Sequence, residues 1–469
     1  MINGKDAIRS TLVTCALGFL CVWQSHADDT NADENREGAS VLSIIERDIV
    51  KATEIIDRDP DAGLEYLRRA TRLNQKMELV KSIKDYEQVL RLSPSNARFY
   101  LQRGELWREI GEPQLAESDF DEALRLIDVA LREEPKLEAF NLRDRAFARY
   151  TKGLVENAIT DLDEAIAKAA ENPSFRSVLL TMRGMAWRRL GDLDKAEADF
   201  AYALEFDPEN ATAFSERGRL HIMRADFAIA IADFDKSIRL NPKHPILYAS
   251  RAYANLNLHE YEKAILDCSE AINIFPLYAP AYRHRGCAHV ALGQIDRALE
   301  DLNQAVRFTP NYVKPTVSGR ELDPKRGPRE RIYYYDFLPQ LDRAGIWRMK
   351  GEWEKAIVDL KETLRMDPAS TQAQNDLAWI QATCPDAKYR DGKSAIELAR
   401  KACEATKWKK DDFIVTLAAA HAENSEYDEA IKRLTQANEI DPKRDAATRE
   451  NLLKHFNQSM PFRDSAKDK

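Results

Sequence analysis

The residue types that most often carry out chemistry are few and scattered in this sequence. It has eight histidines and six cysteines in 469 residues, without clustering at metal-ligand spacing. It has no Gly-x-x-x-x-Gly-Lys phosphate loop, no His-Glu-x-x-His motif, no Cys-x-x-Cys pair and no Gly-x-Ser-x-Gly turn. His221 and His289 fall at equivalent places of a repeated pattern, which indicates histidines packed in a core. We therefore expect no catalytic residue, no metal site and no cofactor, and we predict that the chain is not an enzyme.

Arginine and aspartate, in contrast, recur together along the chain. An arginine occupies the same place in eight successive segments, and an aspartate follows it farther along each segment. A guanidinium group can bind a carboxylate through two parallel hydrogen bonds. Such pairs, when partly buried, fix the register of packed helices more than they add stability. We predict a structural ladder of ion pairs between the arginines Arg69, Arg103, Arg143, Arg183, Arg217, Arg251, Arg285 and Arg343 and the aspartates Asp85, Asp119, Asp161, Asp199, Asp233, Asp267, Asp301 and Asp359.

The elements that position this ladder follow from a strict period. Pro208, Pro242, Pro276 and Pro310 are 34 residues apart, and an alanine precedes each proline by twelve residues. A fixed period of this length is the signature of stacked repeats. Apolar residues recur at helical spacing within each period, and the proline ends a helix because it lacks an N–H. Each repeat is therefore expected to be a pair of antiparallel helices.

This pattern resembles the tetratricopeptide repeat. The family's small, aromatic, alanine and proline positions are matched in order by Gly184, Trp187, Ala196, Phe200 and Pro208, and similar series recur over most of residues 63–444. The resemblance implies an all-α fold, a right-handed superhelical solenoid of about ten antiparallel helix pairs. Residues 377–422 are also similar to a C-terminal repeat variant of tetratricopeptide proteins from planctomycete-type bacteria, which carries no known chemistry.

The resemblance also implies that the first helices of the pairs line a concave face. In the four clean units, at residues 177–312, the positions concerned carry apolar, aromatic and basic side chains. This mixture suits an extended peptide or a partner helix better than a polyanion. The lysine and asparagine set with which some family members bind chaperone tails is not matched. The candidate partner-binding residues are Thr181, Met185, Arg188, Ser215, Arg219, Ile222, Ala249, Tyr253, Leu256, Arg283 and Val290.

Residues 1–27 have the pattern of a cleaved export signal. Lys5 and Arg9 precede an apolar run of about a dozen residues, and Ser25 and Ala27 place small side chains before a cleavage site. The run is too short to span a bilayer comfortably, although an uncleaved anchor stays open. We expect an exported protein of the periplasm or cell envelope, or a secreted one, with no transmembrane span after cleavage.

The remaining chain divides by composition and period. We expect a flexible acidic leader at 28–40, a capping helix at 41–62, a repeat array at 63–312, an irregular basic and tyrosine-rich insert at 313–336, further repeats at 337–444 with a variant loop at 384–392, and a capping helix with a polar tail at 445–469.

The cysteines outside the signal have structural interpretations. Cys268 falls at a core position of its unit, and Cys287 falls in the first helix of the next unit. Cys384 precedes the variant loop and Cys403 follows it. An exported protein could form a disulfide between them, and two buried free thiols are the alternative.

Composition limits the function further. A net charge of −8 argues against a nucleic-acid binder, and 32% charged residues argue against a polytopic membrane protein. Two functions stay open. The first is a non-catalytic protein–protein interaction scaffold of the cell envelope or periplasm that binds a peptide or helix on its concave face. The second is a self-associating structural component of an envelope assembly. We expect protein partners, no nucleic acid and no small-molecule substrate.

Overall fold

The computed structural model describes residues 41–76, 78–133, 137–169, 171–309, 339–442 and 444–464. The predicted export signal, the acidic leader and the insert at 313–336 lie outside the described residues. The chain forms two compact units, one of residues 1–294 and 307–336 and one of residues 295–306 and 337–469. Within the described ranges, every regular element is a helix, which confirms the all-α prediction.

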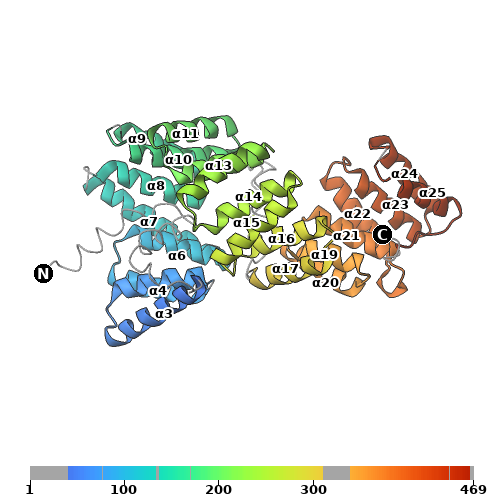
Figure 1. Ribbon diagram of the computed structural model, residues 1–469, viewed down its shortest axis with the longest axis horizontal. Helices are drawn as coiled ribbons and strands as arrows, with labels where there is room; N and C mark the ends of the chain where they lie inside the picture. Colours follow the sequence, from blue (N-terminus) through green and yellow to red (C-terminus); the bar gives the residue numbers. More distant parts are fainter. Residues whose placement is uncertain are drawn as a thin grey trace. The chain divides into compact units, whose positions relative to one another are not determined.

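The first unit is a series of helix pairs in which each helix packs against the next one along the chain (Figure 1). A capping helix, α3, precedes the first pair. The helices are α3 (Val41–Arg58), α4 (Gly63–Gln75), α5 (Leu79–Leu92), α6 (Ala97–Glu109), α7 (Pro113–Glu133), α8 (Glu138–Lys152), α9 (Val155–Lys168), α10 (Pro173–Leu190), α11 (Leu193–Phe206), α12 (Ala211–Met223), α13 (Phe227–Leu240), α14 (Pro245–Asn257), α15 (Tyr261–Ile274) and α16 (Ala279–Ala291).

The second unit repeats the same arrangement over fewer pairs. It contains most of α17 (Ile295–Phe308), then α19 (Pro339–Met349), α20 (Trp353–Met366), α21 (Thr371–Thr383), α22 (Gly392–Ala405), α23 (Asp411–Glu423), α24 (Tyr427–Ile440) and α25 (Ala446–Asn457). A short 3₁₀ helix, Ala387–Tyr389, lies in the variant loop between α21 and α22. The last helix, α25, packs against α24 and α23 and covers the end of the series.

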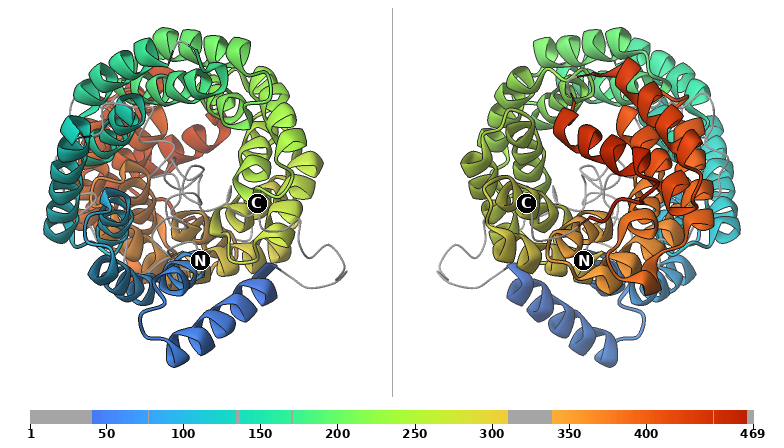
Figure 2. Two further views of the ribbon diagram at one scale, coloured as in Figure 1. Left: turned by 90° about the vertical axis from the view of Figure 1, so that its left-hand side faces the viewer. Right: turned by 90° about the vertical axis from the view of Figure 1, so that its right-hand side faces the viewer.

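The first helices of successive pairs lie closer together than the second helices do. The first helices of successive pairs contact each other, as α10 contacts α12, α12 contacts α14 and α14 contacts α16. The described second helices of successive pairs lie farther apart. A series of pairs packed in this way curves toward its first helices, and Figure 2 shows the first unit following such a curved path. The inner face of the first unit is therefore formed by its first helices.

Small residues on the first helices allow the second helices to approach closely. A Cβ atom added to Gly184 would lie 2.6 Å from Cε1 of Phe200, so no larger residue fits without a shift. In the repeat at 245–278, Ala252 takes the place of the glycine and Cys268 takes the place of the phenylalanine. Both are fully buried in one apolar cluster, so Cys268 is the predicted core residue. The larger first-helix residue is thus matched by a smaller partner.

The predicted ladder of ion pairs is present. Seven arginines on first helices each bind, through two guanidinium nitrogens, an aspartate 16 residues later on the second helix of the same pair, and the shortest N···O distances are 2.5–2.7 Å. The aspartates are 2–6% exposed. The pairs are Arg69–Asp85, Arg103–Asp119, Arg145–Asp161, Arg183–Asp199, Arg217–Asp233, Arg251–Asp267 and Arg343–Asp359. The eighth expected pair, Arg285 and Asp301, has its members in different units and stays a prediction.

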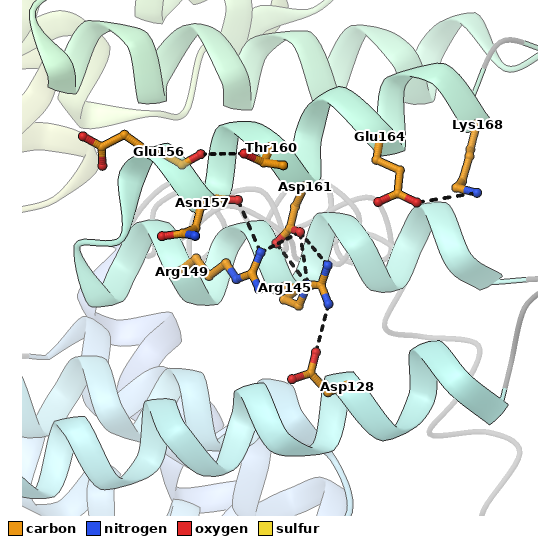
Figure 3. Close-up of polar contacts among 9 residues, drawn as sticks. All are labelled: Asp128, Arg145, Arg149, Glu156, Asn157, Thr160, Asp161, Glu164 and Lys168. Atoms are coloured by element: carbon orange, nitrogen blue, oxygen red, sulfur yellow. Dashed lines mark hydrogen bonds and ion pairs between the residues drawn. The ribbon is translucent and has the colours of Figure 1, made fainter.

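One member of the ladder was predicted wrongly. Asp161 binds Arg145 at 2.7 Å (Figure 3). Arg143 instead binds Asp144, its neighbour in sequence. The first helix of this repeat carries two extra residues. Counting from the start of the repeat therefore leads to Arg143, whereas the residue that faces Asp161 lies two positions later, at Arg145. Arg145 also restores the 16-residue separation of the other pairs.

Three arginines of the ladder also join their helix pair to the preceding one. Nη1 of Arg145 binds Asp128 of α7 at 3.0 Å (Figure 3). Nη1 of Arg183 binds Asp163 of α9 at 2.6 Å, and Nη1 of Arg251 binds Asp235 of α13 at 2.5 Å. Each of these guanidinium groups therefore binds the second helix of its own pair and the second helix of the preceding pair, and so helps to set how successive pairs stack.

Candidate functional site

All eleven predicted partner-binding residues lie on α10, α12, α14 and α16, but four of them are buried. Thr181 is 1% exposed, and its hydroxyl accepts from Nδ2 of Asn210, the residue that caps α12, at 3.2 Å. Ile222 and Ala249 belong to apolar clusters. Ser215 is buried with its hydroxyl bound to its own helix. These four residues are corrected to packing positions, since close stacking of the first helices covers them.

The other seven residues are partly exposed on the inner face of the first unit. They combine aliphatic, aromatic and basic side chains over four consecutive first helices. We call them the inner strip: Met185, Arg188, Arg219, Tyr253, Leu256, Arg283 and Val290. Whether a partner contacts them stays a prediction.

An acidic residue that the sequence interpretation missed organises two arginines of the inner strip. Glu216 on α12 is fully buried. Its carboxylate binds Nη2 of Arg188 at 3.1 Å and Nη1 of Arg219 at 2.7 Å. The two guanidinium groups are thereby fixed in position around one negative charge. The i, i+3 spacing of Glu216 and Arg219 on one helix was the signal that could have revealed the contact.

The buried histidines are packing residues of the repeats. His221 and His289 are both buried, as predicted. Burial, with Arg219 nearby, lowers the pKa of His244 to about 4, and burial with Arg283 nearby lowers the pKa of His284 to about 3. Both imidazoles are thus neutral near pH 7. Among the described residues, no group of three histidine, cysteine or acidic side chains is placed to hold a metal ion.

Cys384 and Cys403 are buried free thiols, so the disulfide alternative is wrong in this structure. Cys384 packs in the cluster around α19–α21, whereas Cys403 packs in the cluster around α22–α24. Burial raises the pKa of Cys403 to about 12 and also raises the pKa of Cys384. Neither thiol is poised to act as a nucleophile near pH 7.

The second unit has a cavity of about 730 Å³ on the side of its first helices α19, α21 and α23, which we call its inner face. Residues of α19, α21, α23 and α25 line it, together with the segment that follows α25, and its walls carry both arginines and aspartates. Trp379, His455 and Phe462 supply its aromatic surface. Sequence interpretation missed this site because it expected only a polar tail after the capping helix of residues 445–469.

The segment that follows α25 lies in the wall of this cavity and is well anchored. The backbone N–H of Asp464 donates to the carbonyl oxygen of Thr383 at 2.9 Å. The indole Nε1–H of Trp379 donates to Oδ2 of Asp464 at 2.8 Å. Nη1 of Arg463 binds Oε2 of Glu423 at 2.7 Å. Contacts of this kind hold an extended peptide against helices.

No helix among the described residues is both long enough and apolar enough to cross a lipid bilayer.

Comparisons with known proteins agree with the repeat pattern. Two profiles described as "Tetratricopeptide repeat" match residues 81–130 and 215–279, and residues 279–312. The human mitochondrial import receptor subunit TOM70 is 27% identical over 160 residues, which are 33% of this chain and 25% of that protein. The chain thus spans about a quarter of the length of this curated relative.

Two solved structures are similar to this chain at low sequence identity. A tetratricopeptide repeat protein from Parabacteroides merdae gives a TM-score of 0.40 at 16% identity, over 67% of this chain and 97% of that chain. The APC/C hetero-tetramer Cut9–Hcn1 gives a TM-score of 0.44 at 13% identity, over 94% of this chain and 89% of that chain.

Proposed function

We propose that this chain, which contains tetratricopeptide repeats, is a non-catalytic protein–protein interaction scaffold that binds a peptide or a partner helix on the inner face of its first unit. The inner strip is the observation that supports this proposal most. It offers aliphatic and aromatic contacts beside fixed guanidinium groups on four consecutive first helices. Tetratricopeptide-repeat proteins are in general interaction scaffolds without catalytic activity.

The chemistry of the inner strip favours a particular type of segment. Met185, Leu256 and Val290 suit an apolar or aromatic side chain of the partner. Arg188 and Arg219 bind the carboxylate of Glu216, and Arg283 adds a third basic side chain on α16. An acidic residue in the partner can therefore form charge-assisted hydrogen bonds with this basic strip. The expected ligand is a short amphipathic segment with at least one carboxylate.

We also propose export to the periplasm or the cell envelope. The basic, apolar and small-residue sequence of residues 1–27 supports this location. Cell fractionation with N-terminal sequencing of the purified chain tests it. A mature chain that begins at Asp28 in an envelope or periplasmic fraction is the expected result, and an intact Met1 in the cytoplasm contradicts it.

Site-specific crosslinking tests the binding proposal. A photo-crosslinking amino acid replaces Met185, Tyr253 or Leu256 in the full chain, and crosslinked products in the native fraction are identified by mass spectrometry. We expect all three positions to give the same partner. Matched controls are Tyr202 and Leu266, which are 53% and 70% exposed on second helices.

The outcomes of this experiment are distinct. The same partner at the inner strip and not at the controls supports the scaffold. Crosslinks only between copies of the chain refute it and favour a self-associating structural component. No strip-specific product also refutes it.

A further inference from the structure

The inner face of the second unit already holds a peptide segment of this chain. Helix α25 ends at Asn457, the backbone turns at Ser459 with a φ of 53°, and residues 460–464 are not helical. We propose that this face is a binding site for an extended peptide in which an aromatic residue is followed by arginine and aspartate. We further infer that residues 459–464 are its intramolecular ligand, which a partner peptide of the same chemistry must displace.

The aspartate of the segment has a receptor of matched chemistry. Asp464 is 7% exposed and accepts a hydrogen bond from Nε1 of Trp379, across 85 residues of sequence. Nη1 of Arg348 lies 3.9 Å from the same carboxylate oxygen. The backbone N–H of Asp464 donates to the carbonyl oxygen of Thr383. Thr383 is the last residue of α21, so its carbonyl oxygen accepts no hydrogen bond within the helix. Both the side chain and the main chain of this residue are therefore recognised.

The arginine and the phenylalanine of the segment also have their own contacts. Arg463 binds Glu423, whose other oxygen accepts from Arg390 of the variant loop at 3.0 Å. The Phe462 ring lies between Trp379 and His455, with centroid distances of 6.2 and 5.6 Å. Aromatic pairs at such distances are favourable. Three consecutive side chains thus reach three different partners, which gives the site specificity for their order.

Pro461 prepares the segment for this mode of binding. Its ring restricts φ, and it also biases Met460 toward extended backbone. A segment restricted in this way loses less conformational entropy when it binds. The sequence Met-Pro-Phe-Arg-Asp therefore has both the contacts and the backbone preference of a peptide ligand.

The site extends beyond the segment that occupies it. The cavity continues over α21 and α23, where Oδ1 of Asn375 and Oδ1 of Asp412 are buried without a hydrogen-bond partner in the described structure. Asn375 is 7% exposed. Buried acceptors of this kind are normally satisfied. A longer peptide from a partner can donate N–H groups to both atoms, which gives it an advantage over the intramolecular segment.

This inference concerns a different surface from the inner strip of the first unit. The two proposals can therefore fail separately, because one is tested by crosslinking in the native fraction and the other with purified chain and a synthetic peptide.

Fluorescence anisotropy with a labelled peptide of residues 458–465, Gln-Ser-Met-Pro-Phe-Arg-Asp-Ser, tests the site. The protein is the full chain, either unchanged or with Phe462→Ala, Arg463→Ala and Asp464→Ala together. An intramolecular segment acts at an effective concentration near the millimolar range. We expect the triply substituted chain to bind the peptide about 10- to 100-fold more tightly than the unchanged chain, because its own segment no longer competes.

Further variants show whether the peptide uses the proposed contacts. Adding Trp379→Phe to the triply substituted chain removes the Nε1–H donor and keeps an aromatic ring, so we expect at least fivefold weaker binding. Trp347→Phe is the matched control, because Trp347 belongs to the same unit and does not line the cavity. A peptide with Phe, Arg and Asp in reversed order is expected to bind weakly.

Several results would overturn the proposal. Equal binding to the unchanged and the substituted chains excludes competition by residues 459–464, and binding to neither excludes the site. If the triple substitution lowers the melting temperature by several degrees, Asp464→Ala alone provides the same comparison with Phe462 and Arg463 retained. Unchanged binding after Trp379→Phe contradicts the recognition of the aspartate.

Discussion

Removing one guanidinium group from the ladder tests whether its pairs are structural. Arg217 and Asp233 are suited to this test because Asp233 is 4% exposed and receives two hydrogen bonds from Arg217, at 2.8 and 2.7 Å. The change Arg217→Met keeps an unbranched side chain and leaves the carboxylate buried without its cation. The same carboxylate then retains only a weak contact with Nε2 of His221, 4.0 Å away.

The size of the effect follows from burial. Breaking a fully buried ion pair costs about 3–5 kcal/mol. The Arg217 side chain is 26% exposed, so water can reach part of the vacated space, and we expect a loss of about 2–3 kcal/mol in the free energy of unfolding of the first unit. For a unit of this size, that loss lowers the melting temperature by roughly 4–12 °C. Replacing both residues, with Arg217→Met and Asp233→Leu, is expected to recover more than half of it.

Urea unfolding of the full chain, followed by hydrogen exchange of α12 and α13, measures this cycle. The matched control is Arg365 with Glu362, which form an equally close pair at 2.7 Å on the surface, 54% and 40% exposed. Arg365→Met should cost much less stability than Arg217→Met, because water screens the exposed pair. The reasoning is refuted if the two single substitutions have the same effect, or if the double variant at the buried pair is less stable than Arg217→Met.

Three further changes have defined outcomes. Gly184→Ala brings a Cβ atom to 2.6 Å from the buried ring of Phe200, so we expect a loss of about 1–3 kcal/mol by thermal unfolding, and a stabilised variant would contradict the packing. His244 has a pKa of about 4 in the folded chain and about 6.5 in the unfolded chain. Between pH 6.5 and pH 4 the unfolded chain therefore binds a proton at His244 that the folded chain does not bind. The free energy of unfolding falls by up to about 3 kcal/mol as the pH is lowered from 7 to 4. The change His244→Gln should flatten this part of the pH profile measured by urea unfolding. Cys384 and Cys403 should resist alkylation at pH 7.5 in the folded chain and react fully in denaturant without a reductant. A disulfide between them, found by peptide mapping, would contradict this prediction.

The local repeat was predictable from the sequence because its physics is confined to one helix pair. The 34-residue period, the small residue of each first helix and the proline after most second helices are set by packing between neighbours in sequence. The same holds for the ladder, since Arg217 and Asp233 are only 16 residues apart. The substitution of Cys268 for a phenylalanine opposite Ala252 follows the same rule.

In the irregular repeat formed by α8 and α9, the position of the ion-pair arginine was predicted wrongly. Two extra residues in the first helix moved the ion-pair position from Arg143 to Arg145, and counting from the unit boundary gave the wrong arginine. The constant separation of 16 residues from Asp161 was the better guide, because it measures the contact itself.

The candidate site depended on tertiary structure. The period identifies the positions that point toward the inner face, but the stacking of successive first helices decides which of them stay accessible, and it buries Thr181 and Ala249. The contact of Glu216 with Arg188 likewise joins two successive helix pairs, α10–α11 and α12–α13. The segment at 459–464 has no period at all, and its contact with Trp379 spans 85 residues. Sequence alone thus determined the helix pair and its internal contacts, because these are short-range and repeated. The stacking of pairs and the return of a non-repeating segment arise from long-range packing, and only the tertiary structure decided them.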